Sequence, residues 1–554
     1  MASNPFTGKT VGQMIQDAAA RHGAREAIIF TDERISYAEL ARRVDRLACG
    51  LLALGIRKDD KVALWLPNRP AWLVAQYACA RIGATVVALN TRYKAHELSY
   101  ILGQSDATTL ILTDHLGPID FLEILEEVIP ELKDTDPGAL HAEKFPQLRR
   151  VIVDAEDPYP GTIRLRDVFD AGDGSDLDDQ LKAARGGVTA DDVFTILYTS
   201  GTTSFPKGAM ISHTNCLPHG WNCGVQLRLT PSDRVLHALP LSGTWGGVNI
   251  PFTTFTHGAC LVLMESFDPG VALYLMEKER ITVWNAVDAM ILGVLEHPDL
   301  DRYDRSSLRT GGVAMTSGGA QSLFDEVVGH IGMRQAFQPY GMTEVNALAL
   351  YHDLDEPAES RKLPGVWPAP GLKVRVVNPD TGQPCKPGEE GELQHRGLLV
   401  TRSYYRKPEE TARAFTEDGW FRSGDLGVQD EAGRTIFKGR LREVLRISHF
   451  MVAPSEIEEF LMAHPKVHQA FVVGVPDVKL GEAPVAYVIP KEGEILSEAE
   501  LQAHCKGKIA SYKIPRHIRL VKDVPRTPGP HGDKVQKARL REQAIQEFRQ
   551  EAQP

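Results

Sequence analysis

The chain has 554 residues, more than one hydrophobic core usually supports, so two or more domains are expected. Its composition is 43% hydrophobic and 24% charged, which is typical of a globular protein and excludes a disordered chain. The net charge of −11 argues against a nucleic acid as the main partner, because phosphate-backbone binding requires a basic face. A local basic patch for a phosphorylated small molecule stays compatible with this charge.

The seven cysteines are odd in number and contain no Cys-x-x-Cys pair, a pattern typical of reduced thiols in a cytoplasmic protein. The N-terminal stretch MASNPFTGKT lacks the basic and apolar segments of a secretory signal. No run of about 18 apolar residues predicts a membrane span. We therefore expect a cytoplasmic protein without a membrane span.

Residues 1–150 alternate between helix and strand patterns. Strands are predicted over 61–66 and in the runs VVALN, TLILT and VIVD, and Gly55 ends a predicted helix. Such alternation predicts α/β layers with largely parallel sheets. The Asp- and Gly-rich segment 172–187 is predicted to be a surface loop. The helix before Gly55 is indicated by four apolar residues at helical spacing: Leu40, Val44, Leu47 and Leu51.

The last 110 or so residues have a different pattern. Ser455 with Glu458, and Ser497 with Glu500, have the spacing of helix capping boxes. The runs AFVVGV and VAYVI predict strands. Short helices mixed with short strands favour a small α+β domain, with its boundary near residues 439–440.

A candidate phosphate-binding loop follows the apolar, strand-like run 193–199. The segment TSGTTSFPKGA, 199–209, supplies glycines for close backbone approach, hydroxyl groups as donors, and the positive charge of Lys207. It is not the ordinary NTPase loop, because Lys207 precedes Gly208 rather than following a glycine. Taken alone, the segment is explained equally well by a phosphate loop and by a flexible turn.

Together with five further motifs, this loop resembles the adenylate-forming superfamily, which includes acyl- and aryl-CoA synthetases, luciferases and peptide-synthetase adenylation domains. The motifs occur in the family's order, and each alone would be weak. They are YTSGTTSFPKGAMISHTN at 198–215, TSGGA at 316–320, YGMTE at 340–344, WFRSGDLG at 420–427, GRLREVL at 439–445 and DKVQKARLR at 533–541.

The resemblance implies an α/β fold with a large, multi-layered N-terminal domain of parallel-rich sheets and a small, mobile α+β C-terminal domain. It implies domains at 1–438 and 444–554, joined by a hinge at 439–443 that contains Glu443. It also implies an acid–CoA ligase of the acyl-CoA synthetase branch, which uses ATP, Mg²⁺ and CoA to convert a carboxylic acid through acyl-AMP. A homodimer is one assembly compatible with this interpretation.

The resemblance also assigns nucleotide-binding residues. Residues on the adenine side would be Tyr340, which could instead be a core aromatic, and Gly341. The β- and γ-phosphates would be held by Thr199, Ser200, Gly201, Thr202, Thr203 and Lys207, although the hydroxyl of Thr203 is as well explained by loop capping. The glycine loop Gly318, Gly319 and Ala320 would lie between adenine and the acyl group, with Gly318 touching both.

The reacting groups would be contacted by three residues. Thr343 would touch the α-phosphate and Glu344 would hold Mg²⁺, which prefers carboxylate and phosphate oxygens; a lone glutamate is otherwise surface charge. Lys534 would neutralise charge that builds up in the transition state, and Lys537 is its competitor. Asp425, otherwise a turn residue, would accept both ribose hydroxyls with Arg440 nearby.

Several positions depart from the family pattern. Gly243 replaces the usual histidine of the acyl-site motif, and we expect Trp245 to wall the acyl pocket, with an ordinary core tryptophan as the alternative. Ser448 and His449 replace two glycines where the CoA arm is expected to pass. His449 would act as a base on the thiol, obstruct the tunnel, or point to solvent. His213 is interpreted as a structural histidine.

Two other functions stay open. The adenylate could be discharged to another acceptor, such as a carrier protein, although no carrier domain is fused to this chain. A nucleotide-binding protein without catalysis would be expected to lack Lys534 or Glu344, and both are present.

Overall fold

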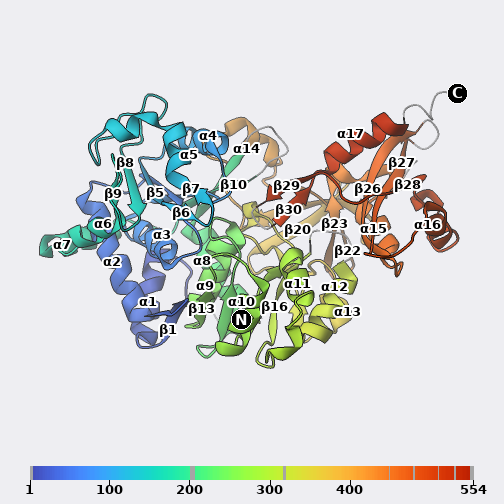
Figure 1. Ribbon diagram of the computed structural model, residues 1–554, viewed down its shortest axis with the longest axis horizontal. Helices are drawn as coiled ribbons and strands as arrows, with labels where there is room; N and C mark the ends of the chain where they lie inside the picture. The colour runs from blue at the N-terminus through green and yellow to red at the C-terminus, as the bar shows by residue number, and fades with distance from the viewer. Residues whose placement is uncertain are drawn as a thin grey trace.

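The structure is a computed structural model that describes residues 4–199, 206–315, 320–447, 450–477, 481–509, 511–529 and 532–548. A large N-terminal part, blue to yellow in Figure 1, lies beside a smaller C-terminal part in orange and red. The expected fold class, a large part with parallel-rich sheets and a small C-terminal part, is confirmed.

The first sheet of the N-terminal part has the strand order β11-β10-β4-β3-β5-β8-β9. Its strands pair in parallel except for β10 and β11, which form an antiparallel hairpin. The strands predicted from sequence are therefore confirmed. Their bounds are β3 Lys61–Trp65, β4 Thr85–Ala88, β5 Thr109–Thr113, β8 Arg150–Asp154, β9 Ile163–Arg164, β10 Val193–Thr199 and β11 Lys207–Ser212.

The second sheet has the order β15-β16-β14-β12-β13-β1-β2, with β17 paired to β16. It is parallel except for the β1–β2 hairpin. Its strands are β1 Glu26–Phe30, β2 Glu33–Ser36, β12 Arg234–His237, β13 Cys260–Leu263, β14 Val283–Trp284, β15 Ala286–Val287, β16 Thr310–Ala314 and β17 Gln335–Phe337.

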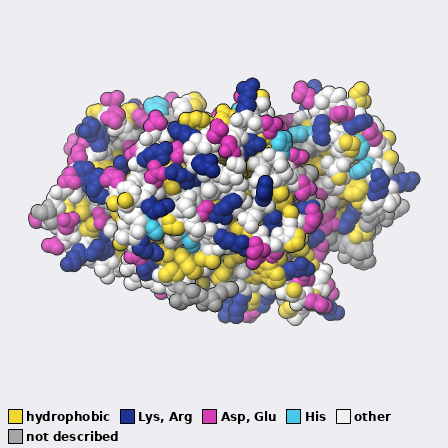
Figure 2. Space-filling view, turned by 90° about the horizontal axis from the view of Figure 1, so that it is seen from below, with side chains coloured by type: hydrophobic (Ala, Val, Ile, Leu, Met, Phe, Trp, Pro, Cys, Tyr) yellow, Lys and Arg dark blue, Asp and Glu magenta, His cyan; other side chains and the backbone are white. Residues whose placement is uncertain are grey.

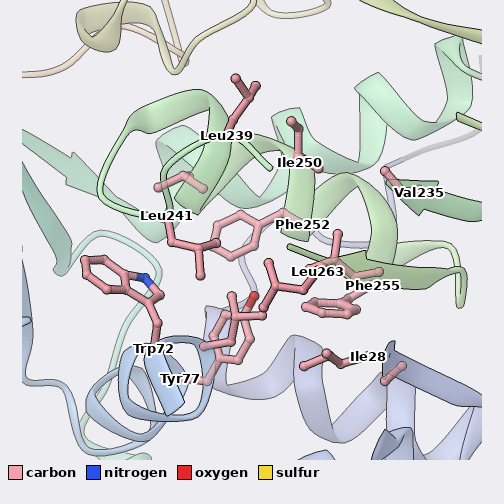
Figure 3. Packing of buried hydrophobic residues seen from close by; sticks show 14 of the residues in the cluster. Ile28, Trp72, Tyr77, Val235, Leu239, Leu241, Ile250, Phe252, Phe255 and Leu263 are labelled. Carbon is pink, nitrogen blue, oxygen red and sulfur yellow. The ribbon is translucent and has the colours of Figure 1, made fainter. Parts of the chain in front are cut away.

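The largest core cluster joins these two sheets through helices that are buried on several sides. Figure 3 shows Trp72 and Tyr77 of one helix beside Phe252 and Phe255 of another. The ring centroid of Tyr77 lies 6.3 Å from that of Phe252 and 6.1 Å from that of Phe255. Burial of each such side chain contributes roughly 1.5–3 kcal/mol. The helices of the N-terminal part are α1 Val11–His22, α2 Tyr37–Ala53, α3 Pro70–Ile82, α4 Ala95–Ser105, α5 Phe121–Val128, α6 Leu165–Ala171, α7 Ser175–Gly186, α8 His213–Gln226, α9 Ile250–Thr256, α10 Pro269–Lys278, α11 Asp288–Leu295, α12 Ala320–Glu326, α13 Ala358–Arg361 and α14 Pro408–Ala414.

One local prediction is confirmed and one is wrong. The four apolar residues predicted to face the core from α2 are all buried, and Gly55 follows the helix with φ +81°. The segment 172–187 is not a loop, because α7 covers most of it. Leu177, Leu181 and Ala184 pack against the main core, and this packing outweighs the Asp- and Gly-rich composition.

A third sheet lies between the two parts and is antiparallel, with the order β20-β21-β22-β23. Its strands are β20 Leu372–Val377, β21 Glu390–Gly397, β22 Phe421–Gln429 and β23 Thr435–Arg440. Asp425 of β22 is the register partner of Arg440, the last residue of β23. The chain then makes a 3-10 turn at Leu441–Glu443 before it enters the C-terminal part.

The C-terminal part has its own sheet, β25-β24-β27-β26 with β28 paired to β27, and its own apolar clusters. Ser497 caps a helix as predicted, accepting from the backbone N–H of Glu500. The other predicted capping box is wrong, because Ser455 donates to the carbonyl of Lys438 and the N-cap is Ala453. The elements are β24 Leu445–Ile447, β25 Phe450–Val452, α15 Pro454–Met462, β26 Val467–Asp477, β27 Gly481–Pro490, α16 Glu498–Cys505, β28 His517–Leu520, β29 Arg526–Gly529, β30 Gly532–Val535 and α17 Lys537–Phe548.

The state of the cysteines, the helices and the surface charge can be compared with the expectations from composition. All seven cysteines are free thiols. Among the described residues, no helix combines the length and apolar character needed to cross a bilayer. On the face drawn in Figure 2, basic and acidic side chains are interspersed.

Candidate active site

The predicted phosphate loop joins the two strands of the β10–β11 hairpin. Thr199 ends β10 and is the register partner of Lys207, which begins β11. The expected phosphate ligands Ser200, Gly201, Thr202 and Thr203 lie outside the described residues. The ammonium group of Lys207 lies 5.2 Å from the ring centroid of Tyr404, and within the described ranges no carboxylate forms an ion pair with it. The charge of Lys207 is therefore available to an anion.

The YGMTE segment folds back on itself directly beside this hairpin. A Cβ atom at Gly341 would lie 1.3 Å from the carbonyl oxygen of Ala347, so only glycine is compatible with this close approach. The next residues form a 3-10 turn, Thr343–Val345. The Thr343 hydroxyl accepts a 2.9 Å hydrogen bond from the Thr244 hydroxyl. Glu344 accepts a 2.8 Å hydrogen bond from the hydroxyl of Tyr404 on Oε1.

The candidate ribose site is centred on Asp425, which is fully buried. Its Oδ2 accepts a 2.7 Å hydrogen bond from the Tyr340 hydroxyl, and its Oδ1 lies 2.7 Å from Nη1 of Arg440. Burial raises the pKa of Asp425 to about 6, and the charge of Arg440 opposes this shift. Within the described part of the chain, Arg440 is the one group that approaches Oδ1, and a carboxylate oxygen has a second lone pair that could accept from a hydroxyl donor.

Tyr340 is buried between Asp425 of β22 and Phe437 of β23. Its ring stacks on Phe437, with centroids 5.0 Å apart and planes at 23°. Phe437 thus covers one face of the Tyr340 ring, so an adenine could stack only on the opposite face. The proposed adenine contact stays a prediction, whereas the hydrogen bond to Asp425 indicates a second role in orienting the carboxylate.

Of the other residues expected near adenine and the acyl group, the structure describes Ala320, Gly243 and Trp245. The glycine loop Thr316–Gly319, which includes Gly318 and Gly319, lies outside the described residues, and Ala320 begins α12. Gly243 precedes a π-helical turn, Thr244–Asn249, and its φ of −97° would allow any side chain. Glycine is therefore not required there by the backbone.

Trp245 is half-buried and lies against β16. A Cβ atom at Gly312 would be 3.2 Å from Cζ2 of the indole, and the ring also packs on Cys223, Ala347 and Leu348. Its indole N–H is buried and donates to no residue that the structure describes. These contacts are compatible both with a pocket wall and with a core tryptophan.

The two candidate lysines of the C-terminal part have different surroundings. Lys534 lies on β30, opposite Thr527 of β29, and Figure 1 shows this hairpin extending from the C-terminal part toward the centre of the molecule. Lys537 instead binds Glu458, with its Nζ 2.7 Å from Oε1 of a carboxylate that is 2% exposed. Lys537 is thus engaged in a structural ion pair, which supports Lys534 as the reactive lysine.

The remaining predicted residues belong to the hinge and to the interior. Glu443 ends the 3-10 turn after β23 and lies 3.9 Å from Nζ of Lys537. Ser448 and His449 lie outside the described residues. His213 is buried, accepts from the backbone N–H of Val11 and packs on Phe194, which confirms the structural interpretation. Burial lowers the pKa of His213 to about 4.

Sequence reasoning missed two residues, Tyr404 and Thr244. They contact Glu344 and Thr343 across 60 and 99 residues of chain, and no local spacing rule connects such positions. Tyr404 lies in the run VTRSYYRKPEET, whose composition and spacing do not indicate which carboxylate the tyrosine would contact.

Comparison with known proteins identifies the class to which this fold and site belong. The model of the AMP-binding enzyme family matches residues 15–405, and that of the AMP-binding enzyme C-terminal domain matches 456–529. The chain belongs to this family, in its acyl-CoA synthetase branch.

Individual relatives cover nearly the whole chain. A Bacillus subtilis protein named "Putative acyl-CoA synthetase YngI" is 37% identical over 97% of this chain and 98% of its own length. The rat mitochondrial medium-chain acyl-CoA ligase ACSF2 is 35% identical over 98% of this chain and 89% of its own length. Among solved structures, ATP-bound MatB from Rhodopseudomonas palustris is 28% identical, with a TM-score of 0.78 over 97% of this chain and 99% of that one.

Proposed function

We propose that this protein is an ATP-dependent acid–CoA ligase, which converts a carboxylic acid, ATP and CoA into an acyl-CoA, AMP and pyrophosphate. The observation that supports it best is the convergence of three groups from distant motifs. Lys207 begins β11 and forms an ion pair with no carboxylate of the described residues. Glu344 contacts the same tyrosine, Tyr404, as this lysine, and the buried carboxylate of Asp425 has a lone pair for a further donor. A nucleoside triphosphate would use the lysine for its phosphates, the glutamate for its metal ion and the buried carboxylate for its ribose.

In the first half-reaction, the substrate carboxylate attacks the α-phosphorus of ATP and the bond to pyrophosphate breaks. Asp425 accepts the ribose hydroxyls, Lys207 and Thr199 hold the leaving phosphates, and Thr343 donates to the α-phosphate. We assign to Lys534 the role of bridging the attacking carboxylate and the α-phosphate, which would stabilise the developing negative charge. The product is an acyl-AMP, whose leaving group is far better than hydroxide.

Magnesium is the metal that suits these residues. Among the described residues there is no cluster of three or more metal-ligating side chains, so a cation would be held by Glu344 and by phosphate oxygens. Magnesium, when bound, would neutralise phosphate charge. Glu344 is suited to hold it because one of its oxygens, Oε2, accepts no hydrogen bond from a described residue.

In the second half-reaction, the C-terminal part rotates about Glu443, and the CoA thiol attacks the acyl carbon and releases AMP. The hinge at 439–443 between domains 1–438 and 444–554 is supported by the position of the 3-10 turn between the two parts. The path of CoA past Ser448 and His449 stays a prediction, as do the cytoplasmic location and the homodimer.

The acid is proposed to be of medium chain length, because the mammalian relatives are named medium-chain acyl-CoA ligases. Trp245 would set the upper size limit. A second candidate function, transfer of the adenylate to another acceptor, is favoured by no observation on the described residues. The pyrophosphate–ATP exchange reaction, run over a panel of aliphatic and aromatic acids, tests the first half. We expect medium-chain acids to support exchange. If no acid in the panel supports exchange, the proposal is contradicted.

A further inference from the structure

Tyr404 lies between the two groups that face the triphosphate. Its hydroxyl donates a 2.8 Å hydrogen bond to Oε1 of Glu344, and Nζ of Lys207 lies 5.2 Å from the centre of its ring. The residue is 6% exposed. An ionised carboxylate can only accept hydrogen bonds, so the tyrosine hydroxyl is the donor in this bond.

Backbone hydrogen bonds hold the Tyr404 segment on both sides. On the β11 side, Tyr404 bridges to Ala209, and the flanking N–H and C=O groups bond to Gly208 and Met210. On the other side, the N–H of Thr401 donates a 2.7 Å bond to the carbonyl of Glu344 itself. The tyrosine hydroxyl and the glutamate carboxylate are therefore fixed relative to each other by main chain as well as by their own bond.

This arrangement leaves the carboxylate of Glu344 with two unequal oxygens. Oε1 is occupied by the tyrosine, whereas Oε2 accepts no hydrogen bond from the part of the chain that the structure describes. An anchored carboxylate with one free oxygen is pre-organised for a hard cation, since outer partners of a metal ligand fix its orientation.

We propose that Tyr404 is a positioning residue that orients Glu344 toward Mg²⁺ in the Mg²⁺·ATP complex, a role that rests on the proposed function. The alternative is that Tyr404 is a core tyrosine whose bond to Glu344 contributes only to folding. The two roles differ in one measurable way, because only the first makes the effect of the hydroxyl depend on both the metal ion and Glu344.

The neighbouring residue provides a matched control. Tyr405 also donates its hydroxyl to a carboxylate, Asp106, at 3.0 Å, and it also has a lysine, Lys61, 5.7 Å from its ring centre. Asp106 and Lys61 are not among the predicted nucleotide-binding residues. Loss of the Tyr405 hydroxyl therefore removes an equivalent bond without touching the candidate site.

The experiment measures binding of α,β-methylene ATP, which cannot be cleaved at the reacting bond, to the full-length protein in EDTA and in Mg²⁺. The quantity of interest is the ratio of the two dissociation constants, the metal-dependent gain in affinity. The variants are Tyr404→Phe, Glu344→Gln, the double variant and Tyr405→Phe. Phenylalanine keeps the ring beneath Lys207, so only the hydroxyl is tested.

We expect Tyr404→Phe to reduce the metal-dependent gain by about 10–100-fold, the range typical of lost outer-shell partners, and to leave affinity in EDTA unchanged. Tyr405→Phe should keep the full gain. In the Glu344→Gln background, Tyr404→Phe should have no further effect on the gain. An unchanged gain in Tyr404→Phe, or an equal loss with and without Glu344, would overturn the inference while leaving the proposed function intact. A wild-type protein with no metal-dependent gain would contradict the proposed role of Glu344 as well.

Discussion

The hydroxyl of Tyr340 donates a 2.7 Å hydrogen bond to Oδ2 of Asp425, across 85 residues of chain. Arg440 approaches the other oxygen of the same carboxylate. The carboxylate is thus held from one side by a neutral donor and from the other by a charge, with Oδ1 still able to accept a ligand hydroxyl. Two of the family's motifs meet in this single group, which makes Asp425 the most sharply defined position of the site.

Nucleoside binding should depend on pH through Asp425. Burial raises the pKa of Asp425 to about 6, above its ordinary value of 3.8, so the carboxyl group becomes neutral in the free protein as the pH falls below about 6. The neutral form loses acceptor capacity, so affinity should rise between pH 5 and pH 7. Adenosine is the suitable probe, because it has no phosphate that titrates in this range.

The control is Asp425→Asn, which cannot ionise. It should bind adenosine weakly and with no pH dependence over this range. The contribution of Asp425 to the free energy of unfolding should change with pH in the opposite direction to adenosine affinity. Because the folded-state pKa is raised, the contribution of Asp425 to stability is largest below about pH 4 and is lost as the pH rises through about 6. An affinity that does not change with pH in the wild-type protein would remove Asp425 from the ribose site.

Thr244→Val should slow adenylate formation. The Thr244 hydroxyl donates a 2.9 Å hydrogen bond to Thr343, which we place at the α-phosphate. A net hydrogen bond contributes about 0.5–1.5 kcal/mol, which corresponds to a decrease of roughly 2–13-fold in the maximal rate of pyrophosphate exchange. Thioester formation from supplied acyl-AMP should change less, and Thr244→Ser should restore the rate. Failure of serine to rescue would indicate a packing role for the side chain.

Lys534→Ala should lower the rate of adenylate formation, whereas Lys537→Ala should lower the stability of the fold. Lys534→Ala should decrease the rate of adenylate formation about 10²–10³-fold, by analogy with loss of a transition-state donor, while the protein stays folded. Lys537→Ala leaves the buried carboxylate of Glu458 without its cation and should lower the free energy of unfolding by on the order of 3–5 kcal/mol. Denaturant unfolding and single-turnover kinetics separate the two. The reverse result would assign the reactive lysine to 537.

Trp245→Ala should shift acyl preference toward longer or bulkier acids, if the indole walls the pocket. The measurement is the pyrophosphate-exchange rate over a series of acids of increasing chain length. A core role predicts instead an unchanged preference with a loss of stability on the order of 3–5 kcal/mol. The contact between the indole and Gly312 suggests a second variant, Gly312→Ala, whose new methyl group would press on the ring and should disfavour the longest acids.

The sequence predicted elements best where periodicity was strong. The helix containing Leu40 and Leu51 and the strands of the first sheet follow from local patterns, because their buried faces repeat at fixed spacing. The α7 helix was missed because its stability comes from contacts of Leu181 and its neighbours with the core, which local composition does not reveal.

The same division applies to the site. Motifs predict Asp425, Glu344 and Lys207 as site residues, whereas no motif predicts Tyr404 or Thr244. Both missed side chains act through hydrogen bonds to residues far away in the sequence, and only the folded chain brings them together. The Ser455 capping box failed for a related reason. Glu458 accepts from Lys537 and from the backbone of Val472, so a tertiary contact replaced the local one.

The most direct test of the ligase assignment is AMP release measured with and without CoA, on each acid that supports pyrophosphate exchange, with the thioester product identified. We expect CoA to accelerate AMP release on medium-chain acids and one acyl-CoA to form for each AMP. If the wild-type protein adenylates an acid but CoA releases no additional AMP with any acid in the panel, the ligase assignment is contradicted and transfer to another acceptor replaces it.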